Sequence, residues 1–167
     1  ESAPAVFAHN VEVVRRLTPG IRDQRCDYDR SLEVLSHAKR RYPGRLVKSS
    51  IMVGIGERDE EVSECLSDLR KAGVDIVTLG QYLRPTPKHA EVDRYVPPET
   101  FDAYRREAEA LGFAFVASGP LVRSSYHAAE GFVSAHGSAP PAAPARRADP
   151  AGDETERLIR PASLVRR

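Results

Sequence analysis

The sequence predicts an α/β protein that holds a partial, parallel β/α sheet followed by a disordered tail. Apolar runs typical of buried strands alternate with segments of helical spacing between positions 5 and 117. Four strand candidates form an arc, because a closed β/α barrel needs about eight strands. From Ser134 onward the chain is rich in Ala, Pro and Arg and contains no aromatic residue. We therefore expect one folded unit over residues 1–132 and a disordered tail over residues 133–167.

The first elements follow from short apolar patterns. Residues 5–8 are strand-like, and residues 11–17 are expected to form a short helix. A second helix is expected over residues 29–42, because apolar side chains recur there at helical spacing up to Pro43 and Gly44. The apolar run over residues 46–53 then predicts a strand.

The remaining elements repeat this alternation. Asp59 is expected to be the N-cap of a helix that ends at Gly73 and has one apolar stripe. Residues 74–79 form the next strand candidate. A helix that starts at Pro98 or Glu99 and closes at Gly112 precedes a last strand candidate over residues 113–117. The stripe of the Asp59 helix consists of Val62, Cys65, Leu66, Leu69 and Ala72.

Charge and cysteine content exclude several function classes. The chain has 25 basic and 24 acidic side chains among 167 residues, a net charge of +1 that gives no broad field for nucleic acid or an anionic membrane. No apolar run approaches the ~20 residues of a membrane span. We therefore expect no nucleic-acid and no membrane partner. Cys65 is expected to be a buried structural thiol and Cys26 a loop thiol, while His37 and His89 are expected at the surface.

The decapeptide from Gly119 to Ala128 reads Gly-Pro-Leu-Val-Arg-Ser-Ser-Tyr-His-Ala and directly follows the last strand candidate. An arginine, two hydroxyls, a phenol and an imidazole are costly to bury without partners, so a bound group would explain their concentration. The alternative is an ordinary polar turn. Strand exits in β/α proteins are where ligands bind, which favours the first interpretation.

Four segments of the chain, in order and at similar spacing, resemble the carboxyl-terminal half of lipoyl synthases. The resemblance extends over about residues 6–128 and includes a His9-Asn10 pair at the first strand-to-helix junction. Lipoyl synthases are radical S-adenosylmethionine (SAM) enzymes, sulfurtransferases of lipoate biosynthesis that insert two sulfur atoms into a protein-bound octanoyl chain. The segments are residues 48–57 (KSSIMVGIGE), 78–86 (TLGQYLRPT), 94–99 (RYVPPE) and 119–128 (GPLVRSSYHA).

The resemblance implies the second half of an incomplete TIM-like radical SAM barrel and two 4Fe–4S clusters in the intact enzyme. It implies that Ser125 binds an iron of the auxiliary cluster, that Arg123 balances the cluster's charge and that Ser124 orients the turn. The implied substrate is an octanoyl-lysine, modified at C6 and C8, on a lipoyl-carrier domain or a glycine cleavage H protein. The implied location is the cytoplasm, or a mitochondrial or plastid matrix in a eukaryote.

The resemblance also places SAM near residues 49–57, with Ser49, Gly54, Gly56 and Glu57 as contacts. A glycine loop beside a carboxylate suits SAM, which carries no phosphate, while the acidic residues 59–61 disfavour a dinucleotide at that helix start. A tight turn with Glu57 in solvent is the alternative. Asn10 and Gln81 are further expected contacts. Asn10 as an N-cap and the neighbouring Tyr82 as a core residue remain alternatives at those positions.

The two cysteine triplets that hold clusters in lipoyl synthases are absent from this chain, whose cysteines are Cys26 and Cys65 alone. A four-iron cluster needs about four ligands, mostly thiolates. We therefore expect that the chain by itself holds no cluster, is inactive, and lacks an amino-terminal half. The alternative is a non-catalytic truncated module, or one chain of a split enzyme, that binds a partner through its open sheet edge.

Overall fold

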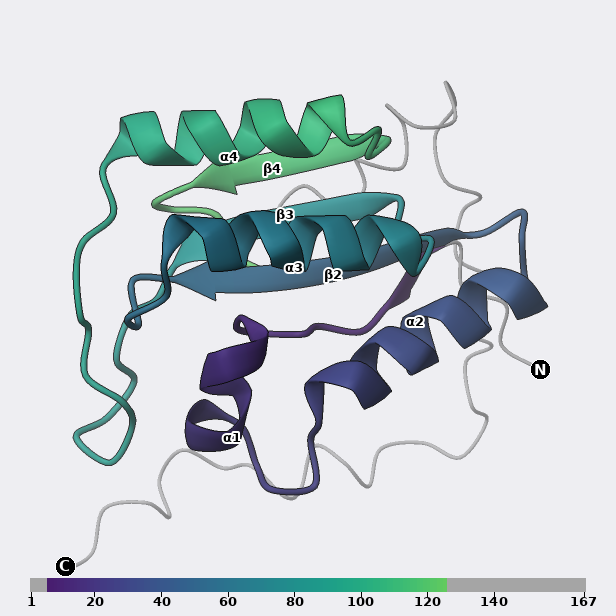
Figure 1. The fold of residues 1–167 in the computed structure, drawn as a ribbon. Helices are drawn as coiled ribbons and strands as arrows, with labels where there is room; N and C mark the ends of the chain where they lie inside the picture. Colours follow the sequence, from purple (N-terminus) through teal and green to yellow (C-terminus); the bar gives the residue numbers. More distant parts are fainter. Residues whose placement is uncertain (1–5, 126–167) are drawn as a thin grey trace, which may run out of the picture.

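The computed structural model describes residues 6–125 and has the predicted alternation of strands and helices (Figure 1). This confirms the α/β class; the interpretation of residues 133–167 as a disordered tail falls outside the described residues and stays a prediction. The elements are β1 (Val6–Ala8), the 3-10 turn η1 (Arg15–Leu17), α1 (Thr18–Ile21), α2 (Tyr28–Arg41), β2 (Leu46–Val53), α3 (Asp59–Lys71), β3 (Ile76–Gln81), α4 (Pro98–Ala110) and β4 (Phe115–Gly119).

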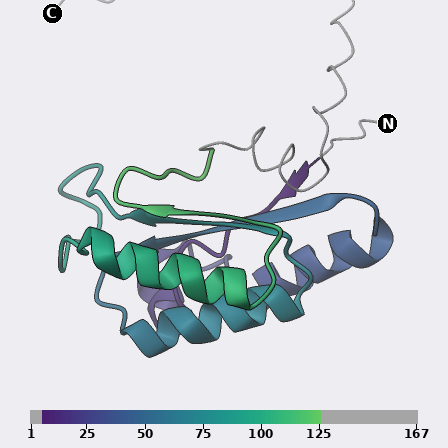
Figure 2. The same cartoon turned by 90° about the horizontal axis from the view of Figure 1, so that it is seen from above.

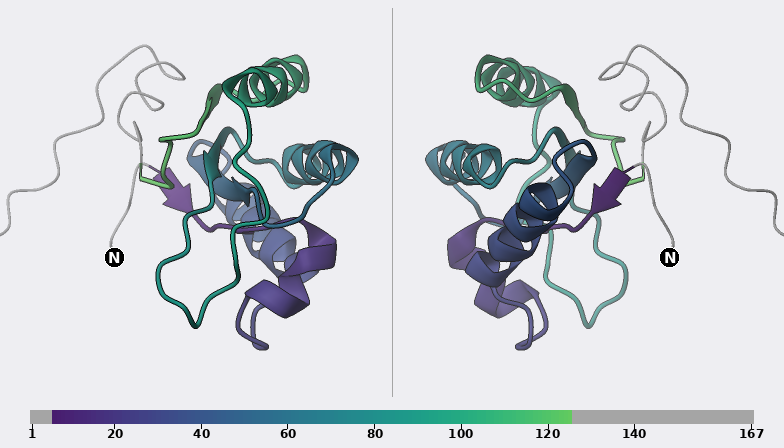
Figure 3. Two further views of the ribbon diagram at one scale, coloured as in Figure 1. Left: turned by 90° about the vertical axis from the view of Figure 1, so that its left-hand side faces the viewer. Right: turned by 90° about the vertical axis from the view of Figure 1, so that its right-hand side faces the viewer.

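All strand pairs are parallel, and the 4-stranded sheet has the order β1-β2-β3-β4. The helices α2, α3 and α4 cover one face of this sheet (Figures 2 and 3). Doubly wound sheets reverse their strand order and carry helices on both faces, whereas a β/α barrel adds its strands in sequence with helices outside. The described residues therefore form an arc of a barrel wall, which confirms the partial β/α sheet.

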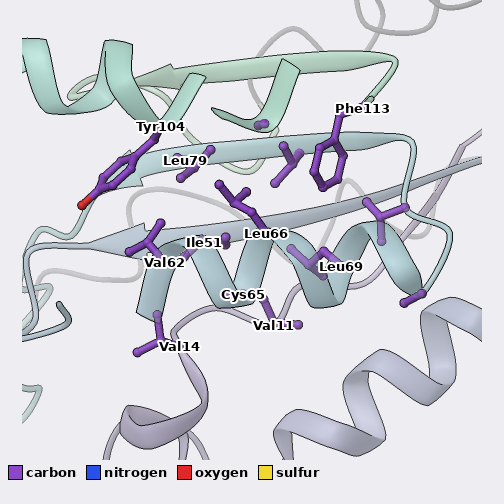
Figure 4. Close-up of a cluster of buried hydrophobic side chains, with 14 of the residues drawn as sticks. Val11, Val14, Ile51, Val62, Cys65, Leu66, Leu69, Leu79, Tyr104 and Phe113 are labelled. Atoms are coloured by element: carbon purple, nitrogen blue, oxygen red, sulfur yellow. The ribbon is translucent and has the colours of Figure 1, made fainter. Parts of the chain in front are cut away.

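The core lies between the sheet and the helices α2, α3 and α4 (Figure 4). Leu66 and Leu69 are fully buried on α3, and they belong to one apolar cluster with Ile51 of β2 and Leu79 of β3. Full burial of such side chains stabilises the fold by about 1.5–3 kcal/mol each. Cys65 is 1% exposed in the same stripe, as predicted, and burial raises the pKa of its thiol to about 12. The thiol is therefore a neutral packing group.

The predicted helix over residues 11–17 is wrong in its first half. The backbone pairs with β2 at one isolated bridge instead, because Glu12 N donates to Ser50 O at 3.1 Å and Met52 N donates to Glu12 O at 2.7 Å. A tight turn at Glu12 also brings Val13 N to Val11 O at 2.9 Å. Helical structure starts only at Arg15. The three β-branched valines in this stretch favour the extended form, and all are buried: Val11, Val13 and Val14. Asn10 is consequently no N-cap; its Nδ2 donates to Glu12 Oε1 at 3.2 Å.

The boundaries of other elements differ by one or two residues from the prediction. The helix α2 begins at Tyr28, one residue before the expected start, with Asp27 as its N-cap, and Arg58 rather than Asp59 is the N-cap of α3. The strands β3 and β4 begin later because Val74 N and Phe113 N still bond to the preceding helices, at Leu69 O and Ala108 O. Within residues 6–125, no helix has the length and apolar character that crossing a membrane requires.

Candidate functional site

The sheet face opposite the helices carries several buried polar side chains among apolar ones. Val47 and Ile51 on β2 belong to the helix-side core, and alternation along the strand turns Lys48 and Ser50 to the other face. Thr78 of β3 lies beside Ser50 in register and shares that face. These polar residues are buried, with exposures of 3% for Lys48, 5% for Ser50 and 0% for Thr78. Buried parallel strands are normally apolar on both faces, so this composition indicates a ligand-binding face.

The segment that follows β4 folds back over this polar face (Figure 2). The carbonyl oxygen of Val122 lies only 2.2 Å from where a Cβ on Gly80 would be, so this close approach requires glycine on β3. The Arg123 guanidinium donates to the carbonyls of Val122, at 2.7 Å, and Pro120, at 3.3 Å. The motif is thus a turn, fixed to the sheet, that presents the exposed side chains of Ser124 and Ser125. The motif's Tyr126 and His127 lie outside the described residues.

Two neighbouring cavities lie between this segment and the sheet, and they share Glu12 and Ser124 as lining residues. The smaller, of about 180 Å³, is lined by Ser50, Gly80, Gln81 and Arg123, among others. The larger, of about 430 Å³, is lined by Val6, Ala8, Asn10, Glu12, Lys48, Ser124 and Ser125. The structure therefore brings four predicted site residues together around these cavities: Asn10, Gln81, Arg123 and Ser125.

The glycine loop after β2 is organised by Glu57. This side chain is buried, and its two oxygens accept hydrogen bonds from Gly54 N at 2.8 Å and Ile55 N at 2.9 Å. The alternative with Glu57 in solvent is therefore wrong. A Cβ on Gly54 would lie 2.3 Å from Gln81 Nε2, whereas the nearest atom to one on Gly56 is 3.9 Å away, on Asp93. Gly54 is closed in by protein, whereas the space beside the Gly56 Cα is open, although the Gly56 carbonyl accepts a hydrogen bond from Arg16 Nη2 at 2.7 Å.

Two other predicted residues make internal contacts. Ser49 lies on the helix-side face of β2, where its Oγ accepts a hydrogen bond from Val11 N at 3.2 Å. Gln81 Nε2 donates to Tyr82 O and Arg94 O, and its Oε1 accepts from Val96 N. Gln81 thereby fastens the loop over residues 83–97 to the sheet. Tyr82 is 6% exposed, which confirms it as a core residue.

Sequence reasoning missed two residues of the larger cavity. The expected helix over residues 11–17 gave no indication that Glu12 lines the cavity. Its positive φ of 69° is a strained backbone conformation, and such conformations concentrate at functional sites. Lys48 was read only as part of an apolar strand. Burial lowers the pKa of its ammonium. The sequence signal that could have identified Lys48 is a lysine that alternates with apolar residues inside a buried strand.

The described residues cannot complete an iron–sulfur site by themselves. No group of three or more His, Cys, Asp or Glu side chains with metal-binding geometry occurs in residues 6–125. Cys26 is exposed and Cys65 is buried in the core, and neither residue lines the two cavities. His37 and His89 are exposed, as expected. Among the described residues, the larger cavity offers carboxylate and hydroxyl oxygens from Glu12, Ser124 and Ser125 but no thiolate, so a cluster there would take its thiolate ligands from elsewhere.

An arc of parallel β/α units that adds its strands in sequence, with its helices on one face, is the architecture of part of a β/α barrel. No protein-family model matches the chain. The chain is 60% identical over 147 residues to the lipoyl synthase of Sorangium cellulosum, a match that covers 80% of the chain and 40% of that protein. The chain belongs to the lipoyl synthase family.

Relatives from eukaryotes support the same assignment. A mitochondrial lipoyl synthase of Branchiostoma floridae is 53% identical over 80% of the chain, and a chloroplastic one of Arabidopsis thaliana is 58% identical over 77% of it. The chain covers 35% of the first protein and 32% of the second. It thus spans less than half the length of the curated relatives it matches.

Proposed function

We propose that this chain supplies one side of a lipoyl synthase active site, in an enzyme that inserts sulfur at C6 and C8 of an octanoyl-lysine. The substrate would be an octanoylated lipoyl-carrier domain or a glycine cleavage H protein. The observation that carries the proposal is the position of Ser124 and Ser125 over a polar sheet face, beside a cavity of about 430 Å³. Family membership supports the same reaction.

In this proposal Ser125 is an iron ligand of an auxiliary cluster. When bound, the two 4Fe–4S clusters and SAM supply the electron, the radical chemistry and the sulfur. An alkoxide oxygen is a harder donor than a thiolate and matches iron in a cluster less well, so Ser125 is a ligand that releases readily. Arg123 holds the turn through the carbonyls of Val122 and Pro120 and so fixes the position of the serine. Ser124 lines both cavities and orients the same turn.

SAM would bind at the carboxyl ends of β1 to β3. Gly56 leaves space beside its Cα for close approach, while Arg16 occupies its carbonyl. Glu57 keeps the loop in shape through its bonds to Gly54 N and Ile55 N. Asn10 lines the larger cavity and is a direct contact in this proposal. Ser49 and Gln81 contribute by holding the neighbouring segments in place. The enzyme would act in the cytoplasm, or in a mitochondrial or plastid matrix in a eukaryote.

The proposal is tested by joining this chain to the amino-terminal part of the Sorangium cellulosum relative, which is 60% identical to it. The chimera, reconstituted with iron and sulfide, should bind two 4Fe–4S clusters and convert an octanoylated H protein to its lipoyl form. The isolated chain, treated identically, should bind no stoichiometric cluster, because residues 6–125 offer no group of metal ligands. About four irons in the isolated chain, or a chimera that folds but holds one cluster, would contradict the proposal.

A second candidate function is that of a non-catalytic module or of one chain in a split enzyme. The favouring observation is the flank at β1, an edge strand in the described sheet. Beside it, an apolar cavity of about 610 Å³ is lined by Phe7, Val34, Ala38 and Tyr42, among others. An unpaired strand edge beside apolar surface favours association. Mixing the two halves as separate chains distinguishes these cases, since a split enzyme regains activity without covalent joining.

A further inference from the structure

The loop over residues 83–97 extends past the carboxyl ends of the strands (Figure 1). Hydrogen bonds within this part of the chain hold the loop in shape. Arg84 Nε donates to His89 O at 2.9 Å, and Tyr82 Oη donates to Ala90 O at 2.9 Å. Compact surface loops that are packed by their own side chains are frequently functional. The loop therefore presents a formed surface before any partner binds.

Three large apolar side chains at this end of the sheet are exposed to solvent. Their exposed fractions are 50% for Leu83, 75% for Tyr95 and 82% for Leu121. Leu83 lines the smaller cavity together with Val122, the neighbour of Leu121. The residues on both sides of Tyr95 bond through their backbones to the side chain of Gln81, which lines the same cavity. The three side chains, here called the rim patch, therefore lie on segments that meet beside this cavity.

The substrate in the proposed function determines which partner fits the rim patch. An octanoyl chain on a lysine stays covalently joined to its carrier protein, so the carrier must lie against the entrance through which the chain passes. The helices α2, α3 and α4 cover one face of the sheet (Figure 2), and ligands enter β/α proteins at the carboxyl ends of the strands. Clustered apolar side chains at a surface mark interaction sites, and tyrosine is enriched at the centre of protein interfaces.

We propose that the rim patch is the docking surface for the octanoylated carrier protein, which contacts it through the apolar surface around its acylated lysine. This inference rests on the proposed function and adds to it a contact with the carrier itself. Neither Tyr95 nor Leu121 lines either of the two cavities. Both side chains therefore act by binding the carrier, and they take no part in the chemistry. Leu83 lines the smaller cavity, so it is left unchanged in the test.

The test uses the chimera with Tyr95→Glu or Leu121→Glu, each of which places a charge in the rim patch. Each change should raise the KM for octanoylated H protein about tenfold, a loss typical of an important contact at an interface. The KM and kcat for a short octanoyl-lysine peptide should stay unchanged, because the peptide enters the cavity without a carrier. Leu111→Glu is the control and should change neither KM, since this exposed leucine follows α4 at the opposite end of the sheet.

Four outcomes would overturn the docking surface. An unchanged KM for the H protein in both variants would do so and would leave the proposed function intact. An equal rise of the KM for the H protein and for the peptide would assign the rim patch to the acyl site or to folding. A dimer of the chain that Tyr95→Glu dissociates, with an unchanged KM for the H protein, would make the patch an interface between copies. A wild-type chimera that converts neither substrate would overturn the proposed function and the docking surface with it.

Discussion

Glu57 illustrates how a single side chain shapes the candidate site. Its two carboxylate oxygens accept the backbone N–H groups of Gly54 and Ile55, and Arg94 Nη2 lies 3.6 Å from its Oε1. These bonds bend the chain sharply after β2 and hold Gly54 against Gln81. The loop proposed to approach SAM is therefore organised before any ligand binds.

Replacing Glu57 by Gln should destabilise the isolated chain by about 2 kcal/mol, because hydrogen bonds to a charged acceptor contribute about 1.5–3 kcal/mol each and one amide oxygen remains. Urea unfolding measures the effect. Glu60→Gln, an exposed change in the first turn of α3, is the matched control and should stay within about 0.5 kcal/mol of wild type. Equal free energies of unfolding for the two variants would show that the hydrogen bonds of Glu57 contribute little to the stability of the chain.

At the residue scale, Arg123 and Ser125 lie in one contiguous segment, and the structure places Ser125 on the wall of the larger cavity. Their roles beside a cluster stay predictions. Ser49 was placed among the SAM contacts, but strand alternation turns it to the helix side, with Val47 and Ile51. Glu12 was not predicted as a site residue, because its position depends on pairing with β2, which local propensity does not reveal.

At the scale of elements, the close approach of β3 to the segment after β4 decides where the serines lie. The backbone of Val122 occupies the space next to Gly80. Gly119, which pairs with Gly80 in register on β4, has ordinary clearance, since a Cβ there would lie 3.6 Å from Val122 Cγ2. A side chain is therefore tolerated at position 119 but not at position 80.

Gly80→Ala should displace the segment that carries Ser124 and Ser125, at a cost of about 1–3 kcal/mol typical of overpacking. In the isolated chain, trypsin should then cleave after Arg123 faster than in wild type, because the segment is released from the sheet. Gly119→Ala serves as the control and should change cleavage little. Equal cleavage rates in both variants would mean that the segment is not held against β3.

Elements with strong periodicity were predictable and those shaped by tertiary contacts were not. The strand β2 matches its predicted bounds, and the stripe of α3 is buried as predicted. The start of β3 and of β4 was misplaced because Val74 and Phe113 complete the preceding helix ends before the strands begin. The spacing of the valine-rich stretch after β1 predicts a helix, but its hydrogen bonds to β2 and a tight turn at Glu12 prevent one there.

At the scale of the whole molecule, alternation of strands and helices predicted the arc, and the order β1-β2-β3-β4 confirms it. The helices lie on one side of the described sheet (Figure 3). An apolar core fills the space between them and the sheet, whereas the other face carries buried polar side chains. That polarity follows from residues at alternate strand positions, such as Lys48 and Thr78, and became interpretable only once the register was known. The central claim is that this face, with Ser125 above it, forms part of a sulfur-insertion site.

The most direct test compares Ser125→Ala, Ser125→Cys and Ser124→Ala in the chimera, with 5′-deoxyadenosine and lipoyl product measured side by side. The account predicts that Ser125→Ala still forms 5′-deoxyadenosine, which depends on the other cluster, but yields no lipoyl product. Ser125→Cys should also impair product formation, because a thiolate binds iron more firmly. Ser124→Ala should be mild, since one turn hydrogen bond contributes about 0.5–1.5 kcal/mol. A wild-type lipoyl yield from Ser125→Ala would contradict the account.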